Sequence, residues 1–397
     1  NSMNTERLLP NGRQTIDHAY IKSVVKVFYS DFLTQGPRIG DFEKAFSEYV
    51  GAKYALACSN GTAALHLCCQ ALGLSSGDKL VTSPVTFLSS ANCAQFVNAD
   101  TLFVDIDSDT VCLSPDKLED LLKKEDVDVV VPVHLAGHSA DMQSIFQLKE
   151  KYGFHIIEDA CHAPGGKYGQ QKVGSCHFSD MSIFSFHPVK HMTAGEGGMV
   201  TTNNEDLYKK LLRFRIHGMH KDPSLYQNKE LAYDPDGELN MWYYEMFEVG
   251  HNYRITDIQC ALGLSQLKKN DKGVDKRRLI ASQYNEAFRD NMFIKTPIEK
   301  TNVKHAYHLY TILVDFDELG KSRNAVMKEL RDQKIGTQVL YIPVHLQPYY
   351  ANKYGTKWGD FPMAEDYYDH CLSIPMFPGL EANEVQHVID CINKVIL

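Results

Sequence analysis

A lysine, a pair of acids and an aromatic side chain each follow a strand-like apolar run in this 397-residue chain. Lys190 lies in "SFHPVKHMTAGEGGMV", after the run Met181–Phe186 and ahead of a glycine-rich turn. A lysine in a desolvated site loses part of its preference for the charged form, so its amine becomes a usable nucleophile. We therefore expect Lys190 to be suited to Schiff-base chemistry.

Two carboxylates end another buried run, in "FHIIEDACHAPGG". Successive side chains of a strand point to opposite faces, so only one of Glu158 and Asp159 is expected to face a site. A carboxylate at this position can be a metal ligand, a base or the partner of a cationic ring. The alternative is an aspartate that only caps the following turn.

Two further strand-to-helix junctions carry suitable groups. "CSNGTAALHL" contains a small-residue turn before a helix that starts near Thr62, and free N–H groups at such a helix start can bind phosphate. "SPVTFLSSAN" places Phe87 at the second junction, where an aromatic ring either packs in the core or stacks on a flat ligand. Pyridoxal phosphate needs all four features: a phosphate site, an acid for its ring nitrogen, a surface for its ring and a lysine for its aldehyde.

The elements that must position these residues alternate between strands and helices from about Asp41 to Val200. This alternation predicts a mostly parallel sheet with both faces covered, in which ligands bind at the carboxyl ends of the strands. The predicted strands are Tyr54–Cys58, Lys79–Ser83, Leu102–Asp105, Val127–Val133, His155–Glu158 and Ser182–Phe186, and the predicted helical stretches are Phe42–Val50, Ala63–Leu72, Leu88–Val97 and Met142–Tyr152.

The pattern changes after about Tyr253. A helical stretch over Asp257–Arg289 carries the charge run "KKNDKGVDKRR", which is typical of a solvated face. It leads into a smaller α/β unit with the predicted elements strand Leu309–Val314, helix Arg323–Lys334, strand Thr337–Ile342 and a last amphipathic helix. We predict a large domain over residues 1–265, including the N-terminal segment, and a small C-terminal domain over residues 266–397.

The composition is that of a globular protein with a sizeable core, at 44% hydrophobic and 23% charged residues. The net charge of −9 disfavours nucleic acid or an anionic membrane as the main partner. Neither a membrane-spanning apolar run nor a signal-peptide core is recognisable, and the ten cysteines are scattered without a CxxC motif. We expect a cytoplasmic protein with reduced cysteines.

Three histidine pairs raise the question of a metal site: His134/His138, His187/His191 and His217/His220. The first follows a strand, Pro188 interrupts the second, and neither an HExxH motif nor nearby acidic partners accompany them. We expect no metal.

The chain resembles the DegT/DnrJ/StrS sugar aminotransferases, a branch of the fold-type I pyridoxal-phosphate enzymes, over nearly its whole length. The resemblance is carried by "FLTQGPRIGDFEKAFSEYVGAKYALACSNGTAAL", "IIEDACHAPGGKYG", "FSFHPVKHMTAGEGGMVTT", "RFRIHGM", "GHNYRITDIQCALGLSQL" and "YIPVHLQPYY". It implies an α/β fold whose large domain holds a mostly parallel seven-stranded sheet and whose C-terminal α/β domain is smaller.

The resemblance also implies roles for individual residues. Lys190 matches the lysine that forms the Schiff base with pyridoxal 5′-phosphate, and Asp159 matches the carboxylate at the ring nitrogen. His162 stands where Gln is common, beside the 3-hydroxyl of the ring. The other implied cofactor contacts are Phe87 on the ring, Gly61, Thr62 and Ser185 at the phosphate, and Asn252, which reaches the phosphate of a neighbouring subunit and so implies a homodimer with shared active sites.

The acceptors of this family are nucleotide-linked keto sugars, and glutamate is the expected amino donor. Thr34, Gln35, Tyr341 and His345 match stretches that approach the substrate. "GHNYRITDIQCALGLSQLKK" and "HLYTIL" look most like the C4 aminotransferase of the pseudaminic-acid pathway, which aminates a UDP-linked 2-acetamido-2,6-dideoxy-4-keto hexose.

Four alternatives remain at this stage. The acceptor can be that of another C3 or C4 sugar aminotransferase, such as the perosamine or legionaminic type. A sugar dehydratase of this fold has histidine in place of the Schiff-base lysine, which Lys190 disfavours. An amino-acid aminotransferase commonly uses an arginine in the small domain to bind a carboxylate, and only Arg323 and Arg331 follow residue 290. A regulatory protein without turnover is the fourth.

Overall fold

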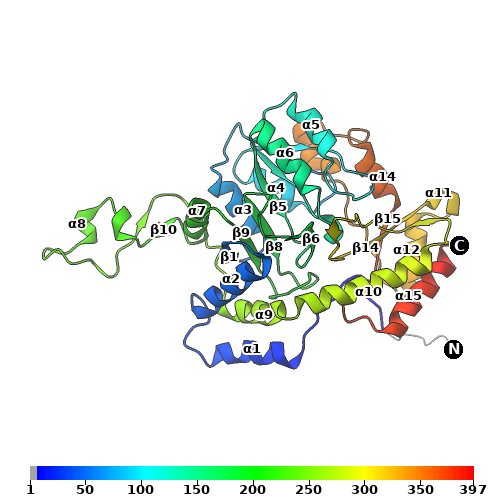
Figure 1. Cartoon of the computed structure of the whole chain (residues 1–397), viewed down its shortest axis with the longest axis horizontal. Helices are drawn as coiled ribbons and strands as arrows, with labels where there is room; N and C mark the ends of the chain where they lie inside the picture. Colours follow the sequence, from blue (N-terminus) through cyan, green and yellow to red (C-terminus); the bar gives the residue numbers. More distant parts are fainter. Residues whose placement is uncertain (1–6) are drawn as a thin grey trace.

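A seven-stranded sheet forms the centre of the protein. The computed structural model describes residues 7–397, and Figure 1 shows the sheet enclosed by helices. The strand order is β1-β9-β8-β5-β4-β2-β3, and β9 alone runs antiparallel to its two neighbours. The predicted seven-stranded, mostly parallel sheet is therefore confirmed. Its strands are β1 (Tyr54–Cys58), β2 (Lys79–Thr82), β3 (Asp100–Phe103), β4 (Val129–Val131), β5 (His155–Asp159), β8 (Met181–Ser185) and β9 (Gly198–Thr202).

Alternating side chains on these strands bury both faces of the sheet. Leu80, Val129 and Ile183 pack in one cluster against α3, α4 and α7, whereas the adjacent Val81 and Val130 belong to a cluster on the opposite face, with α5 and α6. Helices α2 and α9 complete that second face. The helices are α1 (His18–Phe28), α2 (Pro37–Val50), α3 (Gly61–Ala71), α4 (Ser89–Gln95), α5 (Pro115–Leu122), α6 (Met142–Tyr152), α7 (Glu205–Arg215), α9 (Asp257–Leu267) and α10 (Asn270–Phe288).

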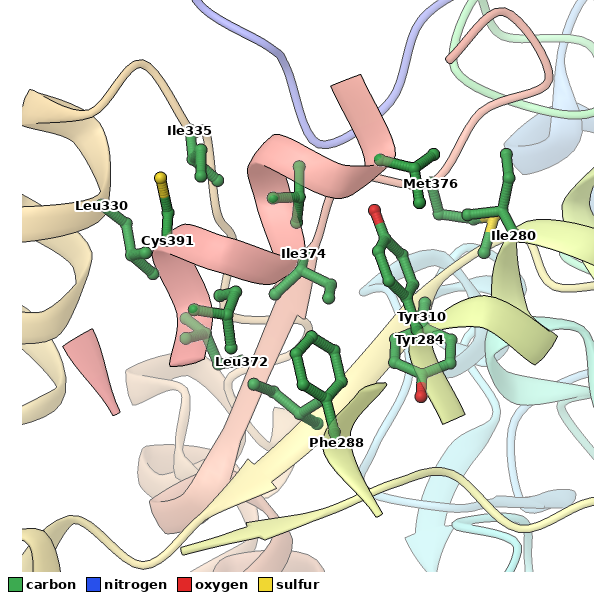
Figure 2. Close-up of a cluster of buried hydrophobic side chains, with 14 of the residues drawn as sticks. Ile280, Tyr284, Phe288, Tyr310, Leu330, Ile335, Leu372, Ile374, Met376 and Cys391 are labelled. Carbon is green, nitrogen blue, oxygen red and sulfur yellow. The ribbon is translucent and has the colours of Figure 1, made fainter. Parts of the chain in front are cut away.

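A second hydrophobic core lies towards the C-terminus. A small antiparallel sheet has the order β12-β14-β15. Figure 2 shows Tyr284 and Phe288 of α10 packed with Tyr310, Leu372 and Ile374 of this sheet. The elements of this region are β12 (Ile294–Lys295), β14 (Tyr310–Val314), α11 (Phe316–Leu319), α12 (Arg323–Asp332), α13 (Pro348–Tyr354), α14 (Pro362–His370), β15 (Cys371–Ile374) and α15 (Ala382–Val395). The division of the chain between residues 265 and 266 falls within α9 and stays a prediction.

An arm formed by residues 217–250 projects from the body beyond α7 (Figure 1). It contains β10 (Met219–His220), α8 (Lys229–Ala232) and β11 (Glu245–Met246), and the two strands pair antiparallel. The carboxylate of Glu245 accepts hydrogen bonds from the N–H groups of Gln227 and Asn228 and from Tyr243 Oη. These contacts give the arm an ordered structure of its own, even though many of its apolar side chains are exposed.

Three sequence expectations need correction. The stretch Thr337–Ile342 is not a strand: only Gln338 pairs with the small sheet, through Ser373, and the chain then crosses to the large sheet, where Val344 N–H donates to Pro84 O at 2.9 Å. In the small sheet, the strand that pairs with β14 is β15 instead. Helix Asp257–Arg289 is two helices, because Asn270 is held by its side chain at Tyr49 Oη and Pro164 O. The pattern also missed β9.

All ten cysteines are unpaired, and nine of them are buried. Within residues 7–397 no helix is long and apolar enough to cross a membrane.

Candidate active site

Asp159 is the last residue of β5, and Lys190 lies beyond the carboxyl end of the neighbouring strand β8. β8 pairs in parallel with β5, with Asp159 opposite Ile183, and Lys190 follows β8 in a turn where its N–H donates to His187 O at 2.9 Å. Burial lowers the pKa of the Lys190 amine, and the neighbouring Cys161 and Asp159 oppose this shift without cancelling it. An amine that loses its proton more readily than usual is a better nucleophile and base.

Asp159 is oriented by a chain of hydroxyl groups from the start of α4. Ser90 Oγ donates to Asp159 Oδ2 at 2.5 Å, and Cys161 N–H donates to Asp159 Oδ1 at 3.2 Å. Thr86 Oγ1 lies 2.9 Å from Ser90 Oγ. Because Ser90 gives its single hydrogen to the carboxylate, Thr86 must donate to Ser90. The carboxylate is buried yet stays an acceptor, as the partner of a protonated ring nitrogen must be.

Glu158 takes no part in this site, as strand alternation predicts. Its carboxylate points to the other face of the sheet, where it accepts hydrogen bonds from Ser179 Oγ and Ser182 Oγ and lies 2.8 Å from His134 Nε2. Burial alone would raise the pKa of Glu158, but these three partners together lower it. Glu158 is a buried structural acid.

The N-terminus of α3 supplies donors for a phosphate. Asn60 caps the helix: its Oδ1 accepts from Ala63 N–H and its carbonyl oxygen from Ala64 N–H. In the part of the chain that the structure describes, the N–H groups of Gly61 and Thr62 have no protein acceptor. Thr62 Oγ1 lies 2.7 Å from Ser89 Oγ, and a Cβ on Gly61 would come within 3.1 Å of Ser185 Cβ. Gly61, Thr62 and Ser185 are thus gathered at one helix start, as expected for an anion site.

Aromatic side chains border the same region. Phe87 is 57% exposed, which leaves a ring face open beside the strand ends. Its ring centroid lies 6.1 Å from that of Tyr341, and Tyr341 Oη lies 3.1 Å from His162 Nε2. His162 is buried, and its ring centroid lies 4.3 Å from that of His308, with the two ring planes tilted by 42°. The structure therefore brings Phe87, His162 and Tyr341 together from three separate segments.

The remaining predicted contacts lie elsewhere. Thr34 pairs with Thr256, and Gln35 lines a hollow of about 290 Å³ with Arg215 and Arg254. Asn252 is exposed near the root of the arm, where it pairs with Ile216. His345 is fully buried, with its Nε2 3.3 Å from Glu365 Oε2, and burial lowers its pKa. No recorded contact joins these four to Lys190, and their binding roles stay predictions.

The histidine pairs do not converge on a common centre. His134 contacts Glu158 and Ala140 N–H, whereas His138 Nε2 accepts from Lys300 N–H. His191 Nε2 donates to Ala306 O at 2.7 Å. Among residues 7–397 no group of three or more histidine, cysteine, aspartate or glutamate side chains is arranged to hold a metal.

Several residues of the site were missed from the sequence. Ser90, Thr86 and Ser89 form its hydroxyl network, and the only signal for them was the cluster of hydroxyl side chains in "SPVTFLSSAN". His308 immediately precedes the predicted strand Leu309–Val314 and gave no signal of its own.

The residues present fit pyridoxal phosphate: unpaired N–H groups for the phosphate, an open aromatic face, an acceptor carboxylate for the ring nitrogen and a lysine of lowered pKa for the aldehyde. The fold and site together define a fold-type I aminotransferase. The family model described as "DegT/DnrJ/EryC1/StrS aminotransferase family" matches residues 14–393, and the chain belongs to this pyridoxal-phosphate-dependent family.

Relatives support this assignment over the full length of the chain. The spore coat polysaccharide biosynthesis protein SpsC of Bacillus subtilis is 38% identical over 98% of this chain and 97% of its own. The structure of Helicobacter pylori PseC, an aminotransferase involved in the biosynthesis of pseudoaminic acid, matches with a TM-score of 0.89 and 31% identity over 98% of this chain and 99% of its own. The Streptococcus pneumoniae putative sugar aminotransferase Spr1654, in its PMP form, matches with a TM-score of 0.87 and 28% identity over 97% and 98% of the two chains.

Proposed function

We propose that this protein transfers an amino group from glutamate to the keto carbon of a nucleotide-linked sugar. The observation that carries the proposal is the pairing of Lys190, whose pKa is lowered by burial, with the buried acceptor Asp159 at the ends of adjacent strands. Two similar proteins, one named for polysaccharide biosynthesis and one for pseudoaminic acid biosynthesis, support a sugar as acceptor.

Some side chains of the site are proposed to bind the cofactor, and Lys190 is proposed to transfer protons. Bound pyridoxal phosphate supplies an electron sink for a carbanion. Gly61, Thr62 and Ser185 hold its phosphate, and Asp159 keeps its ring nitrogen protonated. Lys190 would take a proton from the substrate carbon as a base and give it back as an acid.

Within this class we propose a UDP-linked 2-acetamido-2,6-dideoxy-4-keto hexose as the acceptor. Similarity to PseC over nearly the whole of both chains supports this choice. Thr34, Gln35, Tyr341 and His345 are the proposed substrate contacts. Of the two arginines in the hollow of about 290 Å³ beside Gln35, Arg215 is paired with Glu43, which leaves Arg254 for an anionic group. Arg323 is bound to the backbone carbonyl oxygens of Tyr368 and Cys371, which gives no support to a carboxylate clamp of the amino-acid aminotransferase kind.

We also propose a cytoplasmic homodimer with shared active sites. Asn252 is exposed, so it is available to a neighbouring subunit. On the arm, Met241, Trp242 and Val249 are 92%, 74% and 75% exposed. Large exposed apolar groups on an ordered element are typical of a protein interface, and a second copy of this chain is the proposed partner.

The test separates the two halves of the reaction. Protein loaded with pyridoxal phosphate is first mixed with glutamate, and formation of 2-oxoglutarate and loss of visible absorbance are measured. A panel of UDP-, dTDP- and GDP-linked keto sugars follows, with NMR of each product to identify the aminated carbon and its stereochemistry. Saturable cofactor binding without amine transfer to any sugar would refute the proposal and favour a regulatory protein.

A further inference from the structure

His162 occurs in one tautomer, set by a backbone contact. Its Nδ1 accepts a hydrogen bond from Ala136 N–H at 3.0 Å, so this nitrogen carries no proton. Burial, together with the neighbouring Lys190, His191 and His134, lowers the pKa of His162 well below its usual value, so the ring stays neutral. The single ring proton is therefore on Nε2. Because Nε2 lies 3.1 Å from Tyr341 Oη, His162 must donate to Tyr341.

The turn that fixes this tautomer is itself tightly built. Ala136 has a φ of 60°, a conformation that residues other than glycine seldom adopt. Its carbonyl oxygen accepts from Leu309 N–H at 3.2 Å, and Gly137 O accepts from Ala306 N–H at 3.0 Å. A Cβ on Gly137 would come within 2.7 Å of Tyr307 N. The turn thus contacts His162 on one side and the segment before β14 on the other. These contacts keep Ala136 N–H in place as the donor to His162 Nδ1.

This arrangement leaves the hydroxyl hydrogen of Tyr341 available. Tyr341 Oη accepts from His162, and within residues 7–397 no protein acceptor is recorded for its own hydrogen. Burial raises the pKa of Tyr341, with Asp159 and Cys161 adding to the shift, so the hydroxyl keeps its hydrogen. Tyr341 lies beside Phe87, the residue proposed for the ring face, and close enough to Asp159, proposed for the ring nitrogen, to feel its charge.

We propose that His162 is a positioning residue that holds Tyr341 as the hydrogen-bond donor to the ring oxygen of bound pyridoxal phosphate. This inference rests on the proposed function and assigns a role to the histidine found where glutamine is common. Its donor hydrogen is committed to Tyr341, so the tyrosine delivers the contact that a glutamine amide can make directly. Tyr341 comes from the segment that crosses between the two sheets, so the contact also ties that segment to the cofactor.

The first test needs no cofactor. In the cofactor-free protein, nitrogen NMR of labelled histidines should show one ring, assigned by its loss in His162→Gln, that is protonated at Nε2 and does not titrate near neutral pH. A ring protonated at Nδ1, or one that titrates with an ordinary pKa, would overturn the proposal whether or not the protein is an aminotransferase.

The second test uses the loaded protein and its visible absorption as a function of pH. Tyr341→Phe should shift the apparent pKa of the bound cofactor upward by about one unit, the size expected for one hydrogen bond to an anionic oxygen. His162→Ala should cause a similar shift and the double variant no more than either alone, because both changes remove one unit. His162→Gln should restore most of the wild-type titration. Tyr284→Phe, which removes a buried hydroxyl bonded to Pro375 O in the second core, should leave it unchanged.

Two results would refute the proposal. An unchanged titration in Tyr341→Phe together with a shift in His162→Ala would show that the histidine contacts the cofactor directly. Shifts that add in the double variant would show two independent contacts. If the wild-type protein binds no pyridoxal phosphate, the proposed function fails as well, and the NMR result then shows whether the His162–Tyr341 pair exists independently of it.

Discussion

Ser90 Oγ donates to Asp159 Oδ2 at 2.5 Å and so joins the first turn of α4 to the end of β5. Together with the Cys161 N–H bond to Oδ1, this bond fixes the orientation of the Asp159 carboxylate. It also explains why a serine outside any recognised motif belongs to the site.

We predict that Ser90→Ala weakens the binding of pyridoxal phosphate by roughly 10- to 100-fold, because a hydrogen bond to a charged group contributes about 1.5–3 kcal/mol. Asp159→Asn should weaken it further and abolish turnover, since an amide does not stabilise a protonated ring nitrogen. Fluorescence titration with the cofactor measures both. Ser373→Ala, which removes a buried hydroxyl bonded to Thr311 in the small sheet, serves as the control and should leave affinity unchanged.

Lys190 should be the residue that carries the cofactor. After borohydride reduction of the loaded protein, peptide mapping should find the pyridoxyl group on Lys190, because its amine lies beside Asp159 and has a lowered pKa. Lys190→Ala should show no such label and no transamination. Labelling of another lysine in the wild-type protein would refute the assignment.

The buried Lys190 amine should lower the free energy of unfolding of the cofactor-free protein. The folded-state pKa of Lys190 is lowered, so the unfolded chain binds the proton more tightly. The cost is present in full below the folded-state pKa and diminishes as the pH rises towards the ordinary lysine value. Lys190→Met should therefore raise the melting temperature of the cofactor-free protein at neutral pH, with a difference that narrows in alkaline buffer. An equal or lower melting temperature would contradict this.

How far the sequence could predict the fold depended on the kind of interaction. β1, β5 and β8 were found because buried parallel strands are continuous apolar runs, and Lys190 and Asp159 because they follow such runs. β9 was missed because "GMVTT" contains only two adjacent apolar side chains and follows a glycine-rich turn. Thr337–Ile342 has the composition of a strand, yet it pairs with the small sheet only at Gln338, and Tyr341 contacts His162, which lies far away in the sequence.

In the site, too, contacts between segments that are distant in the sequence were not predicted. Motifs located the ends of the strands, but the orientation of side chains was set by contacts between separate segments. Ser90 and Ala136 act through a hydroxyl and a backbone N–H whose partners lie 69 and 26 residues away. No local pattern encodes such pairs.

Glu158 should govern the acid stability of the protein. Its pKa is lowered in the folded state, so its stabilising effect is present above the ordinary glutamate pKa and is lost as the pH falls through the lowered value. We expect Glu158→Gln to lower the free energy of unfolding by about 2 kcal/mol at neutral pH and to reduce its acid dependence. Urea unfolding at several pH values measures this. The exposed Glu150→Gln removes the same charge and should change little.

The proposed dimer should pass a complementation test, because Lys190 and Asn252 would then serve one site from two subunits. Lys190→Ala and Asn252→Ala proteins should each have little activity. In a hybrid dimer one of the two sites keeps both native residues, so random exchange should restore about one quarter of the wild-type activity. Activity is measured after mixing under conditions that allow subunit exchange, which is monitored with differently tagged chains.

A variant of the exposed arm tests the dimer interface without changing the cofactor site. Met241→Ser with Trp242→Ser changes no residue assigned to the cofactor, so it should weaken the dimer, measured by sedimentation, without altering the fold of the subunit. If the arm holds the partner, these changes lower activity at low protein concentration and the loss is reversed at high concentration, because association follows mass action. A wild-type protein that sediments as a monomer while fully active, or an Asn252→Ala protein with full activity, would refute shared sites.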